Sequence, residues 1–285
     1  YYEQQELEFL PCLVEEAADQ LVIAKWILRK LAHQYDLSLS LAPKITVGKA
    51  GSGLHVHMMI EKDGKNMLVE GGKLSDIAKR AIAGILDLSG ALTAFGNTIP
   101  TSYLRLVPHQ EAPTNICWGD RNRSVLVRVP LGWLSDVDMV SHANPQQDKT
   151  SREFMSKQTF ELRSGDGSAD IYGYLAGIVI AAQHGLEMEN ALEIAEKLYV
   201  NVNIFDDEHK ALLDQLEALP ESCYESAIEL EKRRESFEKN GIFPVGLISS
   251  MIEQLRAFDD KDLSERLYGK HDEIAALVRK HLHCM

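Results

Sequence analysis

The spacing of apolar residues along the first third of the chain changes between a helical and a strand-like period. Apolar side chains recur every three or four positions over residues 14–35 and again over 75–95, which predicts two helices. Glycines interrupt residues 45–60, and this pattern favours a strand, a loop and a second strand. The pair Asp63-Gly64 that follows is typical of a tight hairpin turn. The first third is therefore expected to mix helices and strands.

The middle of the chain continues this alternation. Residues 103–130 are extended and loop-rich, and are expected to end in a strand at 124–129. Residues 158–163 predict another strand, and residues 170–190 predict a helix. We therefore assign the chain to the α+β class, with nearly all of its unusual polar residues in the first 190 positions.

Residues 191–285 differ from the rest because they are helical in pattern and highly charged. Segments 218–239 and 262–283 are expected to form amphipathic helices. We interpret the chain as one domain in two parts. Residues 1–190 form a catalytic core of sheet and helices, and residues 191–285 form its helical C-terminal part.

Composition places the chain among globular proteins and excludes several classes of function. Of its 285 residues 45% are apolar and 26% are charged, and the formal net charge is -13. A chain this acidic is a poor general binder of nucleic acid or of anionic membranes, because phosphate contacts need clustered Lys and Arg. No apolar run approaches the roughly 20 residues that span a bilayer, and no signal peptide is visible.

The four cysteines, Cys12, Cys117, Cys223 and Cys284, are scattered and form no C-x-x-C pair. This spacing argues against a zinc site and a disulfide framework, and it indicates a cytoplasmic location. The first residues carry no initiator Met, so we interpret the chain as a fragment of a longer protein.

Candidate chemistry begins in the glycine-rich segment 51–57. If this segment ends in a strand, His55 and His57 point to the same face, because successive side chains alternate. Two imidazoles that follow a glycine-rich turn suit a metal ion or a phosphate, since glycine lets the backbone approach a ligand closely. The alternative is a pair of histidines on an exposed strand face with no function.

The same alternation places Glu161 and Arg163 side by side on one strand face. Phe160 and Leu162 then form the opposite, apolar face of that strand. An acid beside a base is consistent with a binding site. The alternative is an ordinary surface ion pair, which contributes about 0–1 kcal/mol.

Three arginines, Arg121, Arg123 and Arg128, lie within a stretch of eight residues, although the protein as a whole is strongly acidic. Arg128 lies in an apolar strand, so its side chain must extend to water, pair with an acid or bind an anion. Guanidinium groups suit forked contacts with phosphate or carboxylate, which indicates a polyanion pocket. The alternative is a set of salt bridges between elements.

Two further segments present single polar side chains. Arg105 lies on a strand-like stretch, and Glu111 lies in a loop that prolines on both sides stiffen. Such a loop presents Glu111 to a site, unless it is a plain surface acid. Near the start of the chain, Glu6 and Glu8 share one face if that segment is a strand.

These residues together predict a metal-dependent site for phosphoryl transfer. Carboxylate oxygens and imidazole nitrogens can hold Mg²⁺ or Mn²⁺. Arginines beside such a metal provide the positioning and charge neutralisation that phosphoryl transfer needs. The sequence contains no G-x-x-x-x-G-K-[ST] motif, so the protein is not a P-loop enzyme. The residues by themselves leave the acceptor substrate open.

In their order and spacing, these segments resemble the glutamine synthetase family. Residues 51–58 resemble its ATP-binding signature, 105–113 its glutamate flap, 121–130 its nucleotide-phosphate segment and 161–170 its second-metal segment. The resemblance implies the fold shared with the guanidino kinases, a curved antiparallel sheet covered by helices. It also implies an ATP-dependent ligase that joins ammonium to glutamate through γ-glutamyl phosphate.

The resemblance implies two or more Mg²⁺ or Mn²⁺ ions in each complete site. Glu6 matches a ligand of the first metal ion. His55 and Glu161 match ligands of the second ion, which lies beside the ATP phosphates.

The other matching residues are implied to hold substrates. Those on the ATP phosphates are His57, Arg123 and Arg128. Those on glutamate and the transferring phosphate are Gly51, Arg105 and Arg163. Glu111 matches the flap acid, which covers the intermediate and helps to deprotonate ammonium, and it forms the implied catalytic pair with Arg123.

Three positions depart from the family pattern. Ala50 stands where the family usually has Asn. Residues 108–111 read Pro-His-Gln-Glu instead of Pro-Gly-Tyr/Phe-Glu, and Ser-Gly-Asp follows Arg163 in place of the usual segment with Pro-Asp. Two of these departures touch the amino-acid pocket, so the resemblance implies ATP and metal more firmly than it implies glutamate.

The family's small N-terminal β-grasp domain, with its Glu-x-Glu strand, has no counterpart in this sequence. Full-length members form dodecameric double rings with sites between subunits, so we expect a homo-oligomer and predict that the isolated polypeptide has little or no synthetase activity. Two alternatives stay open, a γ-glutamyl ligase that uses another amine and a synthetase-like protein without turnover.

Overall fold

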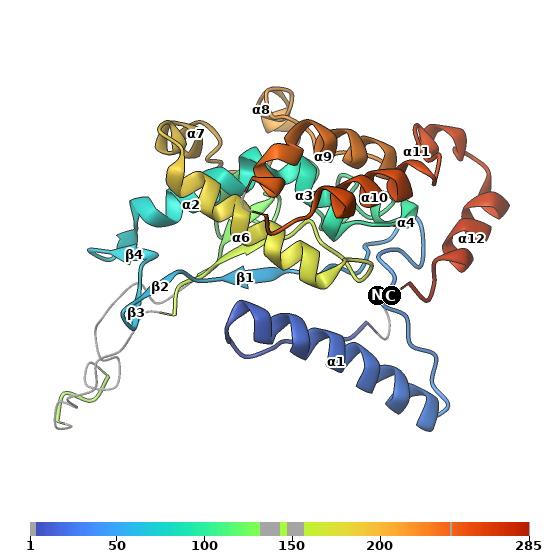
Figure 1. The fold of residues 1–285 in the computed structure, drawn as a ribbon, viewed down its shortest axis with the longest axis horizontal. Coiled ribbons are helices and arrows are strands. Elements are labelled where there is room, and N and C mark those ends of the chain that lie inside the picture. Colours follow the sequence, from blue (N-terminus) through green and yellow to red (C-terminus); the bar gives the residue numbers. More distant parts are fainter. Residues whose placement is uncertain (1–3, 132–142, 147–156, 240, 285) are drawn as a thin grey trace.

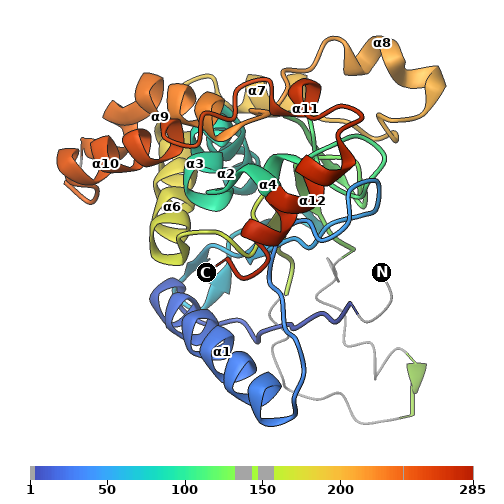
Figure 2. The same cartoon turned by 90° about the vertical axis from the view of Figure 1, so that its right-hand side faces the viewer.

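Helices surround a small sheet in the computed structural model (Figure 1), which describes residues 4–131, 143–146, 157–239 and 241–284. Helix α1 (Val14–Gln34) lies on one side of the sheet, and the other long helices lie on the opposite side, as Figures 1 and 2 show. The remaining described helices are α2 (Asp76–Asp87), α3 (Ser89–Gly96), α4 (Pro100–Tyr103), α6 (Ile171–Glu187), α7 (Ala191–Lys197), α8 (Lys210–Leu213), α9 (Cys223–Glu238), α10 (Val245–Arg256), α11 (Leu263–Arg266) and α12 (His271–Lys280), with a 3₁₀ turn at Asp207–His209.

Four short strands form the sheet in the order β1-β8-β7-β6. They are β1 (Val56–Met58), β6 (Trp118–Asp120), β7 (Val127–Val129) and β8 (Phe160–Leu162). Strands β1 and β7 both pair antiparallel with β8, as expected, whereas β6 pairs parallel with β7. In this register His57 and Arg128 both lie opposite Glu161. The pairing therefore places three candidate residues in one row across the sheet.

The predicted strands at 124–129 and 158–163 are confirmed in shorter form, but the strand predicted at the start of residues 45–60 is wrong. Residues 45–50 form turns instead of a strand, with the Lys49 amide donating to the Thr46 carbonyl at 3.3 Å. Residues 4–13 run without strand pairing, so the conditional pairing of Glu6 and Glu8 on one strand face does not apply.

The hairpin predicted at Asp63 and Gly64 is confirmed. The pair joins β2 (Glu61–Lys62) to β3 (Lys65–Asn66), and both turn residues have positive φ, 51° and 74°. This is the backbone that a two-residue hairpin loop requires. A second small hairpin follows, formed by β4 (Val69–Glu70) and β5 (Lys73–Leu74).

Most predicted helices are confirmed, but two are divided. The helix predicted over 75–95 breaks at Leu88 into α2 and α3, where the Ser89 hydroxyl donates to the Leu86 carbonyl at 2.7 Å. A serine that bonds to nearby backbone competes with regular helix geometry, which explains the break. The helix predicted over 262–283 ends after α11 because Gly269 adopts a φ of 74° before α12 begins.

A continuous apolar core lies between the sheet and the helices on the side opposite α1. It includes Phe160 and Leu162 from β8 and aromatic rings from α3 and α9. The rings of Phe95 and Phe237 pack 5.4 Å apart between centroids. Residues before and after position 190 thus share one core, and the sheet's inner face is fixed by it.

Two properties of the chain can be read directly from the structure. No helix in the described ranges is long and apolar enough to cross a membrane. The four cysteines are free thiols, of which Cys117 and Cys223 are buried.

Candidate active site

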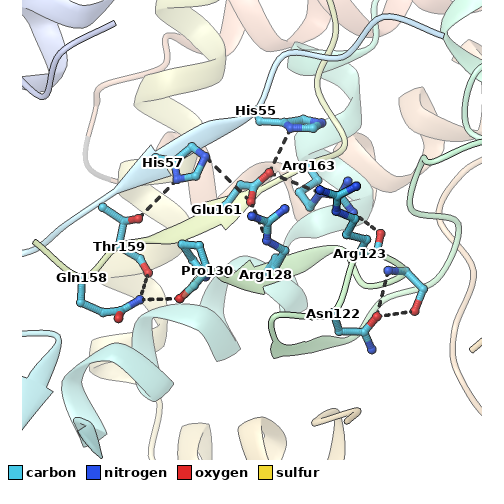
Figure 3. Close-up of polar contacts among 11 residues, drawn as sticks. His55, His57, Asn122, Arg123, Arg128, Pro130, Gln158, Thr159, Glu161 and Arg163 are labelled. Atoms are coloured by element: carbon cyan, nitrogen blue, oxygen red, sulfur yellow. Dashed lines mark hydrogen bonds and ion pairs between the residues drawn. The ribbon is translucent and has the colours of Figure 1, made fainter. Parts of the chain in front are cut away.

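Cationic side chains surround Glu161 on one face of the sheet (Figure 3). Its Oε1 atom is 3.0 Å from His55 Nδ1 and 3.3 Å from Arg163 Nε. Its Oε2 atom is 3.2 Å from Arg128 Nε and 3.8 Å from His57 Nε2. We call these five residues the sheet cluster. They come from three neighbouring strands and the residues next to them, so the sheet itself brings them together.

Strand alternation explains why the cluster forms on this face. Phe160 and Leu162 are completely buried against the helices, so Glu161 must point the other way. The predicted shared face of Glu161 and Arg163 is confirmed, and so is the shared direction of His55 and His57, because both imidazoles reach the same carboxylate.

Glu161 is buried, with an exposed fraction of 1%, yet it is ionised. Burial alone would raise its pKa, but the hydrogen bond from His55 and the charges of His55, Arg128 and Arg163 outweigh burial and lower the pKa to about 2. Its Oε2 atom accepts no hydrogen bond from any described residue. A buried anionic oxygen without a hydrogen-bond donor is suited to bind a cation.

His55 keeps one ring nitrogen for a ligand. Burial lowers the pKa of His55, and this effect exceeds the opposing hydrogen bond to Glu161, so the ring is neutral at pH 7. Because Nδ1 faces the carboxylate, Nε2 carries the free lone pair. A carboxylate that orients an imidazole in this way is common around protein-bound metals. In this geometry Nε2 points away from Glu161, so an ion held by both residues requires the imidazole to turn.

Arg105 lies beneath the cluster, and its predicted position on a strand is wrong. It follows helix α4, whose first residue is Pro100, and it is 2% exposed. Its guanidinium donates to the Ser164 carbonyl at 2.7 Å and to the Arg163 carbonyl at 3.0 Å. Arg105 thus supports the backbone that carries Arg163, and its expected contact with substrate remains a prediction.

Two glycines before His55 allow Arg105 to approach. A Cβ on Gly51 would collide with the Pro43 carbonyl and the Arg105 side chain. A Cβ on Gly53 would collide with the Arg105 guanidinium and come within 2.9 Å of His55 Nε2. The glycine-rich turn is therefore required by close packing beneath the cluster.

Glu111 and Arg123 lie apart from the cluster, beside a hollow of about 560 Å³. The other charged residues that line this outer hollow are Asp120 and Arg121, so two acids face two bases. The hollow adjoins the cluster through one peptide, because the Arg163 guanidinium donates to the Arg123 carbonyl. The structure thus divides the predicted residues between two neighbouring places.

Glu6 does not join either group. It is exposed on the extended N-terminal segment, where Gln4 Nε2 contacts Ser52 Oγ at 3.2 Å and the Gly51 carbonyl at 3.4 Å. Among the described residues, no three His, Cys, Asp or Glu side chains come close enough together to hold a metal ion. Of the expected metal ligands, the sheet brings together His55 and Glu161.

Sequence reasoning missed two residues that shape the site. Asn122 accepts from the Ser124 amide at 2.9 Å and donates to the Val202 carbonyl at 2.6 Å, so it fixes the loop between the arginines. Lys44 is fully buried and bonds to Gln110 beside Glu111. A lysine within the apolar run of residues 41–47 was the available signal for the second.

Comparison with known proteins gives a consistent match. The family model described as "Glutamine synthetase, catalytic domain" matches residues 2–257. The glutamine synthetase of Pyrococcus furiosus is 35% identical over 230 residues, which are 80% of this chain and 47% of that protein. That of Methylococcus capsulatus is 30% identical over 241 residues, 83% of this chain and 45% of its own length. The chain therefore spans about half the length of the curated relatives that it matches.

Solved structures agree on the fold. The glutamine synthetase of Plasmodium falciparum superposes with a TM-score of 0.66 at 21% identity and covers 90% of this chain and 54% of its own. A GmaS structure in complex with ADP superposes with a TM-score of 0.65 at 21% identity, covering 89% and 53%. At this identity the likeness concerns the fold.

Proposed function

This chain belongs to the glutamine synthetase catalytic-domain family, and from this premise we propose that it carries the ATP- and metal-binding part of a ligase that joins ammonia to glutamate. The observation that supports this most directly is the sheet cluster. Two guanidiniums and two imidazoles surround one carboxylate, which neutralises only part of the charge of the two guanidiniums. In a protein with a net charge of -13, such a local excess of positive charge suits a polyphosphate.

We propose that His55 and Glu161 hold Mg²⁺ or Mn²⁺. The Oε2 atom of Glu161 accepts no hydrogen bond, and the neutral ring of His55 offers a nitrogen, so both are donors of the kind that such an ion takes once the ring turns towards it. When bound, the ion would neutralise phosphate oxygens and make the terminal phosphorus easier to attack. Glu6, the expected ligand of the other metal ion, stays a prediction because its exposed segment lies outside the cluster.

In the first step of the proposed reaction, His57 and Arg128 bind oxygens of the ATP phosphates. An oxygen of the glutamate side-chain carboxylate attacks the terminal phosphorus, the bond to the bridging oxygen breaks, and ADP leaves. Arg163 and Arg123 offset the negative charge of the transferred phosphoryl group. Catalysis of this kind consists mainly of positioning and charge neutralisation, which fixed guanidiniums provide.

In the second step, the nitrogen of ammonia attacks the acyl carbon of γ-glutamyl phosphate. The carbon–oxygen bond to phosphate breaks, and inorganic phosphate and the amide are the products. We assign to Glu111 the uptake of the proton from ammonium, because its carboxylate lines the outer hollow beside Arg123. Gly51 keeps the expected role of admitting glutamate close to the backbone.

The second candidate is the same chemistry with a larger amine. The outer hollow, at about 560 Å³, is much larger than the ~30 Å³ that a molecule the size of water or ammonia occupies. The flap segment 108–111 also departs from the usual family pattern. The changed flap is the observation that favours another amine, since the hollow must also admit glutamate, and the catalytic steps would be unchanged.

Replacing Arg128 with glutamine is expected to weaken ATP binding about 10- to 100-fold, which corresponds to the loss of one charge-assisted hydrogen bond. Isothermal titration calorimetry with ATP and Mn²⁺ measures this. The matched control is Arg234→Gln, since Arg234 pairs with Glu238 on α9 at a similar exposure and should leave affinity unchanged. If the Arg128 variant and the wild type bound ATP with equal affinity, Arg128 would not be part of the ATP site.

The 285-residue chain by itself is predicted to form little or no amide, because metal ligands are missing: within the described residues no three His, Cys, Asp or Glu side chains form a metal site. Phosphate release is measured with ATP, Mn²⁺, glutamate and ammonium, and then with methylamine and larger amines. The Pyrococcus furiosus relative serves as the positive control. Rapid turnover by the chain alone would contradict the prediction, and the preferred amine would identify the acceptor.

We further propose assembly into a homo-oligomer, as the family resemblance implies, and a cytoplasmic location, as the scattered cysteines indicate. The division into a core at 1–190 and a helical part at 191–285 remains a prediction. Domain boundaries can be tested by limited proteolysis, which should spare the shared apolar core.

A further inference from the structure

Lys44 is a buried cation for which none of the expected roles accounts. Its side chain is fully buried, and its Nζ atom donates to the Lys49 carbonyl at 2.7 Å and to Gln110 Oε1 at 2.5 Å. Burial, with a smaller contribution from the charge of Arg105, lowers the pKa of Lys44 to about 8, so the ammonium keeps its proton at neutral pH. A buried charge is costly unless hydrogen bonds satisfy it, so both contacts matter to the fold.

Its partner Gln110 lies between two residues whose backbone is left-handed. His109 has a φ of 60° and Glu111 a φ of 58°. Residues with a Cβ rarely adopt this conformation, and it persists only where surrounding contacts hold it. The ring of His109 packs against Phe205 with centroids 5.4 Å apart, so the loop is held from outside by Phe205 and from inside by Lys44.

The segment that carries Lys44 also supports the glycine-rich turn before the sheet cluster. The Ser52 amide donates to the Pro43 carbonyl at 2.9 Å, and this same carbonyl leaves no room for a Cβ on Gly51. Lys44 therefore connects the turn that leads into the cluster with the loop that presents Glu111 to the outer hollow.

We propose that Lys44 is a positioning residue, whose bond to Gln110 fixes the loop so that Glu111 stays at the outer hollow beside Arg123. The inference rests on the proposed function only for the role of Glu111 at the acceptor amine. The anchoring itself is a property of the folded chain and can be measured without catalysis.

Hydrogen–deuterium exchange of the backbone amides of Val107 and residues 109–112 tests the anchor in the full 285-residue chain. Lys44→Met, which removes the donor at similar volume, and Gln110→Met, which removes the acceptor near the surface, should each raise exchange of this loop about tenfold or more. Gln110→Glu keeps an acceptor for the ammonium and should restore slow exchange. The control is Lys25→Met, since Lys25 is a partly buried lysine that donates to the Gly167 carbonyl at 2.8 Å, away from the loop.

The affinity for ATP and Mn²⁺ is measured on the Gln110 variants and should change less than twofold, because Gln110 belongs neither to the sheet cluster nor to the turn before it. Unchanged loop exchange in the Gln110→Met variant would overturn the proposal even if the Lys44 variant failed to fold. An equal rise in the Lys25 control would overturn it too. If the wild type binds no ATP but the variants show the predicted differences in exchange, Lys44 still positions the loop and the proposed function is wrong.

Discussion

Replacing Glu161 with glutamine should reduce the affinity for ATP with Mn²⁺ at least about 100-fold, because a metal ligand contributes no less than the outer-shell groups that support it. The same change leaves Arg128 and Arg163 without their shared anion in a buried place. Breaking a buried ion pair from one side costs about 3–5 kcal/mol of unfolding free energy. Calorimetric titration and urea unfolding measure the two effects separately.

Lowering the pH should reduce the difference in unfolding free energy between the wild type and the Glu161→Gln variant. The folded state lowers the pKa of Glu161 to about 2, below its ordinary value of 4.5, so ionisation stabilises the folded state above about pH 4.5. This contribution, about 3 kcal/mol, is lost as the pH falls from 4.5 towards 2. The difference in unfolding free energy should therefore be largest near neutral pH and smaller at pH 3.

Asp87→Asn is the matched control for both measurements. Asp87 also accepts from a histidine and an arginine, His184 and Arg233, each at 3.1 Å, but it lies on α2 outside the sheet cluster. This variant should keep the nucleotide affinity of the wild type and lose less stability, since the pair is partly exposed. If both variants lost affinity equally, the cluster would have no special part in binding.

Gly84→Ala is expected to destabilise the protein by about 3 kcal/mol or more, the upper range for overpacking a core. Gly84 of α2 meets Gly185 of α6 where the two helices cross, and a Cβ there would collide with the Ala181 carbonyl and the Gly185 amide. These atoms belong to backbone, so no side-chain rotation can relieve the collision. Because α6 also packs against α1, α3 and α9, the midpoint of thermal unfolding should fall by several degrees.

Gly246→Ala in α10 provides the contrast. A Cβ on Gly246 would meet no heavy atom within 4 Å, so this variant should be neutral or more stable by about 0.5–1 kcal/mol through helix propensity. Similar unfolding midpoints for the Gly84 and Gly246 variants would contradict the close crossing of α2 and α6.

The strand that carries Glu161 could be predicted from sequence because one apolar face and one polar face alternate over residues 158–163. That rule also gave the shared direction of His55 and His57. Sequence did not show that β1 and β7 flank β8, which is what joins the two histidines, Arg128 and Glu161 in one place. Strand order depends on long-range packing, and no local pattern encodes it.

Local patterns failed where tertiary contacts determine the backbone. Arg105 looked like a strand residue, but it follows the short helix α4 and is held by carbonyls 58 and 59 positions away. The break between α2 and α3 depends on the hydroxyl of Ser89, which periodicity alone does not weigh. Lys44 was missed because the meaning of a buried lysine depends on its acceptor, Gln110, which lies 66 positions later.

Crystals of the chain grown with Mn²⁺ and ADP would test the central claim most directly. Anomalous scattering should locate Mn²⁺ between the side chains of Glu161 and His55, with the imidazole turned towards the ion and the diphosphate within reach of Arg128 and His57. Manganese and nucleotide bound elsewhere on the surface, with the ion pairs of Glu161 undisturbed, would contradict the assignment of this sheet face as the nucleotide site.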